Sequence, residues 1–486
     1  MSKARFESVL PAHRDLYYDG KWQAPAGGYT ETLNPGTGQS LGRCAEASAV
    51  DVDAAVNAAH RAWKDWRRTK PLERAALLRK AAAVLRANAE ELALIDSANC
   101  GNPIREMLKD AVLAAIQIEY FAGLASEAKG ETVPMGDAAL NYTLREPYGV
   151  CGRIVAYNHP IMFTAGKMAA PLASGNTVIM KPPVQAPLSA YRMMELLDGI
   201  FPPGVLNILT CAKAGSEALV AHPLVPRLSL IGSVPTGRAI ATAAAARLKH
   251  VTLELGGKNA CIIYPDADVE RATRGAVDGM NFTWCGQSCG STSRLFVHES
   301  VYERVIDGMM AHMKSYQPGI PTEMDTTMGA IISRAQLDKI LGYIELGRKE
   351  GATLVYGGKP PSDAGLANGY FVEPTVFTDV THDMRLAREE IFGPVLSVIK
   401  WRDENEMFDQ VNAVDYGLTA SLWTTNLANA LRGASRLEAG YVWVNNVSAH
   451  FYGASFGGYK QSGIGREEGA EELLSYTQVK NVNITL

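Results

Sequence analysis

Short apolar runs recur along most of the chain, and segments of helical character separate most of them. The stretch between residues 149 and 256 contains VCGRIVAY, NTVIMK, GVLNILT, RLSLIG and HVTLEL, and the stretch after residue 257 continues with NACIIY and RLFVH. Each run has the length of a strand and is apolar on both faces, as parallel strands are when helices cover both sides of a sheet. The pattern predicts an α/β fold with two doubly wound parallel-sheet domains.

Alanine-rich segments with a helical pattern precede the first of these runs. We expect one helix to begin after Asp51, which is placed as an N-cap, and two more to cover residues 71–98 and 103–128. Residues 20–50 are dense in Gly, Pro, Thr and Asn, and they predict turns and short strands.

Two further segments alternate between apolar and polar residues. Residues 130–148 hold LNYTLRE between turn formers, which predicts a hairpin or a projecting strand, and the chain ends on SYTQVKNVNITL. Two alternatives stay open for these strands. They pair with the sheet edge of another subunit, or they are edge strands paired within their own chain.

Length and charge narrow the class of protein. The chain has 486 residues, of which 47% are apolar and 20% charged, and its formal net charge is −4. This length exceeds what one hydrophobic core serves and predicts two or three domains. Because no basic or acidic block is present, we expect neither nucleic acid nor a membrane as a partner. No apolar run reaches the ~18 residues of a transmembrane helix.

Cysteine and histidine usage limits the chemistry further. Seven cysteines and nine histidines are scattered without a CxxC pair, an HExxH motif or a Cys/His cluster. An odd number of dispersed cysteines predicts reduced thiols and a cytoplasmic protein, and we expect no metal site. The first twenty residues contain no apolar stretch of the kind found in a secretory signal.

One cysteine has unusual neighbours. In GQSCGSTSR, residues 286–294, Cys289 lies among small residues, mainly glycines and serines. A buried cysteine behaves as a small hydrophobe, whereas a nucleophilic cysteine needs open space and hydrogen-bond donors nearby. The small neighbours provide that space, but this stretch alone does not decide between the two roles.

Two motifs at predicted strand ends suit a ligand. In LIGSVPTGRAI, a strand ends at Gly232, and Ser233 caps a helix whose free N–H groups suit a pyrophosphate. The spacing is not GxGxxG, and a capped helix without a ligand is at least as common. In NTVIMKPPV, Lys181 leaves the end of a strand, where it either reaches a ligand or is solvated.

Two other motifs carry candidate catalytic groups. In TLELGGKN, Glu254 follows an apolar strand, where burial would raise its pKa toward that of a general base; the alternative is a glutamate that faces water. In YNHPIMF, Asn158 lies in a turn fixed by Pro160, where its amide either donates to an oxyanion or only forms the turn.

The order of these motifs along the chain resembles the aldehyde dehydrogenase superfamily. Further matches follow at EEIFGPV (389–395), NAVDYGLTASLWT (412–424) and SFGGYKQSGIGRE (455–467), so the resemblance covers nearly the whole chain. It implies a Rossmann-like cofactor domain, a catalytic domain, a small β arm for oligomerisation, and a homodimer or homotetramer. The expected boundaries are residues 1–128 and 149–256 for the dinucleotide-binding domain, 257–445 for the catalytic domain, and 129–148 and 470–486 for the arm.

The resemblance implies catalytic roles for four residues. Cys289 would attack the carbonyl of an aldehyde, and the Asn158 amide with the Cys289 backbone N–H would hold the oxyanion. Glu254 would activate the water that hydrolyses the thioester, so that a free acid is released. Lys167 matches a lysine on a proton-relay path, although a buried structural ion pair explains it equally well.

The resemblance also implies NAD as cofactor. Its expected contacts are Lys181, Gly232, Ser233, Leu255, Glu390 and Phe392. Where NAD-preferring members commonly carry Glu, three residues after this lysine, the chain has Val184. A valine neither binds the ribose hydroxyls nor repels a 2′-phosphate, so the use of NADP stays open.

The resemblance places the substrate in a pocket lined by His159, Phe163, Trp284, His450 and Phe456. Gly166 stands where a tryptophan is common in the family, and the volume it frees, together with two histidines, predicts a bulky, aromatic or polar aldehyde. Three rivals stay open. They are a CoA-acylating dehydrogenase, which does not need the base Glu254, a thiol esterase, and a catalytically silent family member.

Overall fold

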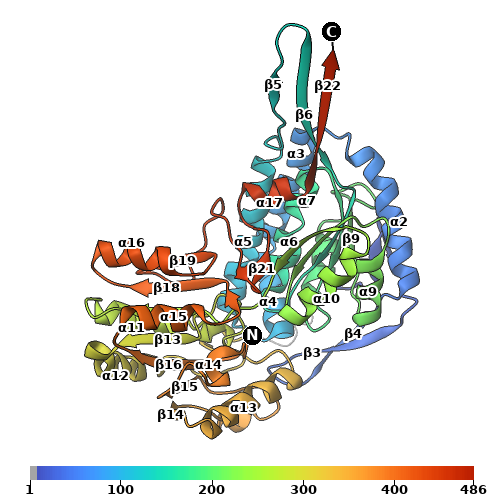
Figure 1. The fold of residues 1–486 in the computed structure, drawn as a ribbon. Coiled ribbons are helices and arrows are strands. Elements are labelled where there is room, and N and C mark those ends of the chain that lie inside the picture. Colours follow the sequence, from blue (N-terminus) through green and yellow to red (C-terminus); the bar gives the residue numbers. More distant parts are fainter. Residues whose placement is uncertain (1–7, 486) are drawn as a thin grey trace.

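The computed structural model describes residues 8–485 and consists of two sheet-based lobes and a projecting arm (Figure 1). Both large sheets are built mainly from parallel strands with helices on both faces. The predicted α/β class with two doubly wound sheets is confirmed. Within residues 8–485, no helix combines the length with the apolar composition that crossing a bilayer requires.

The first sheet has the strand order β2-β1-β9-β8-β7-β10-β11-β21. Its strands are β1 (Leu16–Tyr18), β2 (Lys21–Gln23), β7 (Val150–Ile154), β8 (Thr177–Lys181), β9 (Leu206–Ile208), β10 (Arg227–Ile231), β11 (His250–Glu254) and β21 (Gly463–Ile464). From β7 the order runs to β8 and β9 on one side and to β10 and β11 on the other, and these five strands are parallel. The crevice at the carboxyl ends of β7 and β10 is where such sheets bind ligands.

Helices cover both faces of this sheet. One face carries α3 (Pro71–Ala87), α4 (Ala89–Cys100), α5 (Ile104–Gly123), α6 (Pro160–Gly166), α7 (Ala169–Ala173) and α8 (Leu188–Leu196), and the other carries α2 (Ala49–Trp66), α9 (Lys213–Ala221) and α10 (Val234–Ala245). The prediction of one helix over 71–98 is wrong, because Asn88 leaves the helical conformation at φ −111° and its side chain donates to the carbonyl of Val84. The next helix ends at Gly123 and does not reach residue 128.

The second sheet has the order β14-β15-β16-β13-β12-β18-β19, with only the edge strand β14 antiparallel. Its strands are β12 (Ala260–Ile263), β13 (Arg294–His298), β14 (Thr353–Tyr356), β15 (Thr375–Thr378), β16 (Val395–Trp401), β18 (Thr419–Trp423) and β19 (Tyr441–Val444). The main helices of this lobe are α11 (Val269–Asp278), α12 (Tyr302–Met313), α13 (Arg334–Lys349), α15 (Glu404–Asn412) and α16 (Leu427–Arg436).

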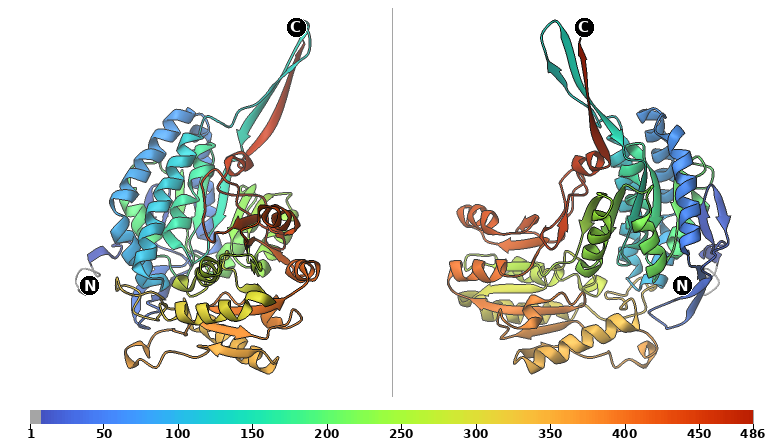
Figure 2. Two further views of the ribbon diagram at one scale, coloured as in Figure 1. Left: turned by 90° about the vertical axis from the view of Figure 1, so that its left-hand side faces the viewer. Right: turned by 45° about the vertical axis from the view of Figure 1, so that its right-hand side comes forward.

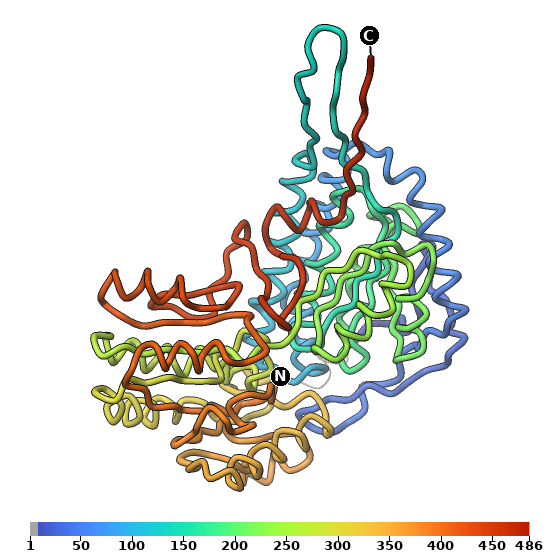
Figure 3. The backbone as a smooth tube through the Cα atoms, in the orientation of Figure 1, coloured from blue at the N-terminus to red at the C-terminus, as the bar shows by residue number. Residues whose placement is uncertain are grey.

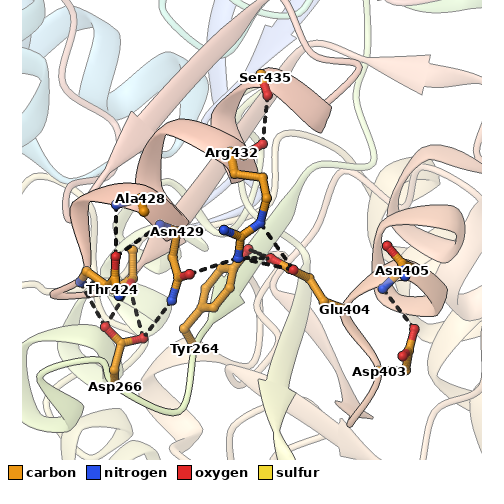
Figure 4. A network of polar contacts seen from close by, with 11 residues as sticks. Tyr264, Asp266, Asp403, Glu404, Asn405, Thr424, Ala428, Asn429, Arg432 and Ser435 are labelled. Atoms are coloured by element: carbon orange, nitrogen blue, oxygen red, sulfur yellow. Dashed lines mark hydrogen bonds and ion pairs between the residues drawn. The ribbon is translucent and has the colours of Figure 1, made fainter.

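A polar network ties the end of β12 to the start of α16 (Figure 4). The Asp266 carboxylate accepts hydrogen bonds from the Thr424 hydroxyl at 2.7 Å and from the backbone N–H of Asn426 at 2.9 Å. Beside it, the Arg432 guanidinium pairs with Glu404, which also accepts from the Tyr264 hydroxyl. The network satisfies free N–H groups at the helix start and fixes the neighbouring strands β12 and β18.

After β19 the chain returns to the first lobe, where β21 pairs with β11, and then enters the arm (Figure 3). The arm consists of β5 (Thr132–Pro134), β6 (Ala139–Pro147) and β22 (Thr477–Thr485). It projects away from both lobes (Figure 2). Of the two alternatives for these segments, pairing within the chain is observed. β6 and β22 form an antiparallel ladder in which Pro147 lies opposite Thr477 and Ala139 lies opposite Thr485.

Candidate active site

Cys289 lies in a loop that follows a short 3-10 helix, η1 (Phe282–Trp284). Six of the seven cysteines are buried, and Cys289 alone is partly exposed. The Asn259 side chain, directly before β12, donates to the backbone carbonyls of Cys289 at 2.7 Å and Ser291 at 3.0 Å. Thr419 N–H donates to the Asn259 oxygen at 3.1 Å, so one amide holds the loop against the starts of two strands.

Backbone turns in the left-handed region shape this loop. Asn281, Cys285 and Gly286 have φ of 55°, 54° and 64°. A Cβ on Gly286 would lie 2.3 Å from the carbonyl oxygen of Gly393, which leaves no room for a larger residue. The Cys289 loop therefore packs tightly against the EEIFGPV segment.

Asn158 lies between these two segments. It follows β7 and precedes α6, and it is buried. The ring of Tyr157 on one side meets Phe392 edge-on at 6.0 Å between centroids, and the ring of His159 on the other side lies 5.7 Å from Trp284. The Asn158 backbone carbonyl accepts from Asn102 at 2.8 Å, whereas its side-chain oxygen has no partner among the described residues.

Glu254 ends β11, and its side chain is buried with both carboxylate oxygens unpartnered among residues 8–485. Burial and the nearby carboxylate of Glu467 raise its pKa well above the usual range. Burial and the carboxylates of Glu254 and Glu390 raise the pKa of Cys289 to about 12. The Glu254 carboxylate therefore lies close enough to Cys289 to influence the ionisation of its thiol.

Lys167 belongs to a buried charge cluster that motif analysis missed. Its amine lies 2.8 Å from one Glu467 oxygen and 3.8 Å from Glu472, and Arg153 lies 2.5 Å from the other Glu467 oxygen. All four side chains are at most 4% exposed. Burial alone would raise the pKa of Glu467, but Arg153 and Lys167 lower it to about 2. The ion pairs match the structural interpretation of Lys167, and Glu254 borders the cluster.

Three of the expected cofactor residues stand at the carboxyl ends of parallel strands of the first sheet. Lys181 is the last residue of β8, Gly232 follows β10, and Ser233 caps α10 by accepting from the Thr236 N–H at 3.4 Å. Gly232 N–H donates to the backbone carbonyl of Glu254 at 3.0 Å, which brings this candidate phosphate-binding turn beside the candidate base. Val184 is 39% exposed and presents no charge.

The other expected cofactor residues are Glu390, Phe392 and Leu255. Glu390 accepts from the Gly257 N–H at 3.0 Å, and Phe392 takes the left-handed conformation at φ 55°. Leu255 packs so closely on α10 that a Cβ on Gly237 would lie 2.7 Å from it. A helix N-terminus, a lysine and a partly buried carboxylate are groups that could hold a dinucleotide.

The expected substrate residues form two aromatic groups. His159 lies 5.2 Å from Phe163 and 5.7 Å from Trp284, and His450 lies 4.7 Å from Phe456. Each histidine also has a carboxylate partner that the motifs did not reveal. His159 pairs with Asp110 at 2.7 Å, and His450 pairs with Glu468 at 3.1 Å.

The expectation that Gly166 opens the pocket is wrong. A Cβ on Gly166 would lie 2.2 Å from the side-chain oxygen of Gln117, which is buried on α5. The volume left by a missing tryptophan is therefore filled by this amide. Gln117 is 49 residues away in sequence, and no local pattern connects it with the glycine.

Comparisons with known proteins show the family to which the chain belongs. The model of the aldehyde dehydrogenase family matches residues 22–482. The aldehyde dehydrogenase tropH of Talaromyces stipitatus is 52% identical over 99% of this chain and 95% of its own. A solved NAD+ complex of an aldehyde dehydrogenase from Bacillus cereus is 39% identical with a TM-score of 0.96, over 100% of this chain and 99% of that one. A P. syringae indole-3-acetaldehyde dehydrogenase, solved with NAD+ and IAA, is 34% identical with a TM-score of 0.96 over 99% of both chains.

Proposed function

Because the chain belongs to the aldehyde dehydrogenase family, we propose that it oxidises an aldehyde to the carboxylic acid through a covalent intermediate on Cys289. The observation that carries this proposal is that Cys289 alone among the seven cysteines is partly exposed, in a loop close enough to the buried, unpartnered carboxylate of Glu254 for that charge to raise the pKa of the thiol. A structural role for Cys289 would not need either feature.

The proposed reaction uses three groups of this chain. The Cys289 thiol loses its proton to solvent, and Sγ bonds to the carbonyl carbon as the C=O π bond opens. The Asn158 amide and the Cys289 backbone N–H stabilise the oxyanion; removal of one such donor typically costs about 2.7–4 kcal/mol of barrier. Bound NAD⁺ would supply the acceptor for the hydride that leaves this carbon. Glu254 then takes a proton from water, the hydroxide displaces the Cys289 thiolate from the thioester, and the acid is released while Glu254 returns its proton to the thiolate.

We propose NAD⁺ as the dinucleotide, held by Lys181, Ser233 and Glu390. The solved Bacillus cereus relative binds NAD+, which supports this choice. Because Val184 has no charge, use of NADP⁺ as well is part of the proposal. The two outer arm strands, β5 and β22, have unpaired edges among residues 8–485, which supports assembly into a homodimer or homotetramer through the arm.

Two substitutions test the mechanism. Cys289→Ala should abolish dinucleotide reduction with any aldehyde and leave dinucleotide binding measurable by fluorescence. Glu254→Gln should keep a stoichiometric burst of reduced dinucleotide and slow the steady state. An equal loss of burst and turnover would contradict the role of Glu254 in hydrolysis.

The rival functions are tested with the same protein. A strict requirement for CoA would indicate the acylating reaction, and ester cleavage without any dinucleotide reduction would indicate a thiol esterase. Absence of any aldehyde oxidation would overturn the proposal.

A further inference from the structure

A buried carboxylate orients the imidazole of His159 beside the candidate oxyanion donor. His159 Nδ1 lies 2.7 Å from Asp110 Oδ2, and the Asp110 side chain is 3% exposed. With Asp110 accepting from Nδ1–H, the neutral imidazole carries its lone pair on the other nitrogen, Nε2, which is then a hydrogen-bond acceptor. Nε2 has no partner among residues 8–485, and the His159 side chain is 14% exposed, so the ring borders open space.

The surroundings of His159 suit an aromatic molecule. The rings of Phe163 and Trp284 lie 5.2 and 5.7 Å from the imidazole. An aromatic surface with one free ring nitrogen at its edge suits a ring that carries a hydrogen-bond donor.

The charges around His159 disfavour an anionic ligand. The Asp110 carboxylate lies 2.7 Å from the imidazole. A substrate carboxylate has no proton to donate to Nε2 and would be repelled by Asp110, whereas a neutral hydroxyl donates a proton and is not repelled.

Resting on the proposed function, we infer that the substrate is an aromatic aldehyde with a ring hydroxyl, which donates to His159 Nε2 while the ring packs on Trp284 and Phe163. His159 is then a specificity-determining residue, and Asp110 is a positioning residue that keeps Nε2 as an acceptor. This narrows the earlier expectation of a polar or anionic group to an uncharged hydroxyl.

The test compares kcat/KM for benzaldehydes that carry hydroxyl, methoxy or carboxyl groups at each ring position. Methoxy compounds match the electronic effect of the hydroxyl but cannot donate a hydrogen bond. We expect a hydroxyl-over-methoxy ratio of about tenfold or more at one position, because sites built to bind a hydroxyl reject analogues that lack its donor. His159→Phe should reduce this ratio to about one, and His159→Gln, which keeps an acceptor, should retain part of it.

A matched control replaces another carboxylate-paired histidine far from the site. His312 pairs with Asp278 at 3.0 Å on the surface of α12, so His312→Phe should leave the ratio unchanged. The inference is overturned if the wild-type protein oxidises benzaldehyde without a hydroxyl preference, if carboxybenzaldehydes are preferred, or if His159→Phe keeps the ratio. Failure of every aldehyde with both dinucleotides would instead overturn the proposed function.

Discussion

Replacing Glu467 by glutamine removes one charge from the buried cluster around Lys167 and changes little in size. Glu467 bridges Arg153 at 2.5 Å and Lys167 at 2.8 Å, and its side chain is 2% exposed. In Glu467→Gln, the two buried cations lose the carboxylate that bridges them, and Glu472 remains at 3.8 Å from Lys167. An uncompensated buried charge is among the costliest single changes in a protein.

The loss in the free energy of unfolding has a similar magnitude by two independent arguments. Breaking a buried ion pair by removing one partner typically costs about 3–5 kcal/mol. Although burial alone would raise the pKa of Glu467, Arg153 and Lys167 lower it from 4.5 to about 2, which corresponds to about 3 kcal/mol. Because the pKa of Glu467 is lower in the folded protein, its contribution to the free energy of unfolding is fully present above pH 4.5. This contribution is lost as the pH falls toward 2.

The assay is thermal unfolding at pH 7 and one fixed protein concentration. At about 2.1 cal/mol/K per residue, unfolding of 486 residues carries an entropy of about 1 kcal/mol/K, so Tm should fall by about 3–5 °C. The control Glu270→Gln breaks an exposed pair with Arg274, in which Glu270 is 84% exposed, and should shift Tm by less than about 1 °C. Adding Lys167→Met to Glu467→Gln should recover part of the loss, because it restores charge balance. Equal shifts in Glu467→Gln and the control, or a further fall in the double variant, would refute this reasoning.

Three other predictions follow from the site. Because burial and carboxylates raise the pKa of Cys289 to about 12, its alkylation by iodoacetamide should accelerate about tenfold per pH unit from pH 7 to 9, and mass spectrometry should find the label there; a rate independent of pH would contradict this. Val184→Glu should lower kcat/KM for NADP⁺ about tenfold or more relative to NAD⁺, and an unchanged ratio would place the ribose elsewhere. Gly166→Ala should cost about 1–3 kcal/mol in unfolding free energy through its clash with Gln117, and Gln117→Ala should relieve that cost; no relief would contradict the packing.

The fold was largely predictable because apolar runs on both faces of a strand leave few alternatives to a covered parallel sheet. The errors lie where a single side chain overrides a pattern. The alanine-rich stretch from 71 to 98 favours helix throughout. Nevertheless, a helix ends at Asn88, whose side chain donates a hydrogen bond to the carbonyl of Val84. A short polar residue offers the backbone such an alternative, and propensity alone cannot show that it is used.

The candidate site divides in the same way. Cys289, Glu254 and Asn158 stand in local motifs, and the fold brings their segments together. The partners that set their environment come from distant parts of the chain: Glu467 is 314 residues from Arg153, and Asp110 is 49 residues from His159. Such pairs depend on tertiary packing, and the pattern of a single sequence does not reveal which distant residues meet.

The path of the last strand has a mechanical consequence. β22 begins at Thr477, directly after Tyr476, whose hydroxyl contacts Arg153 at 3.1 Å and Ser229 at 2.9 Å beneath the first sheet. A molecule tethered to a surface by its C-terminal end would carry tension first on the ladder with β6 and then, once that ladder yields, on the tyrosine anchor. Attachment through this end would therefore transmit load toward the buried charge cluster that borders Glu254.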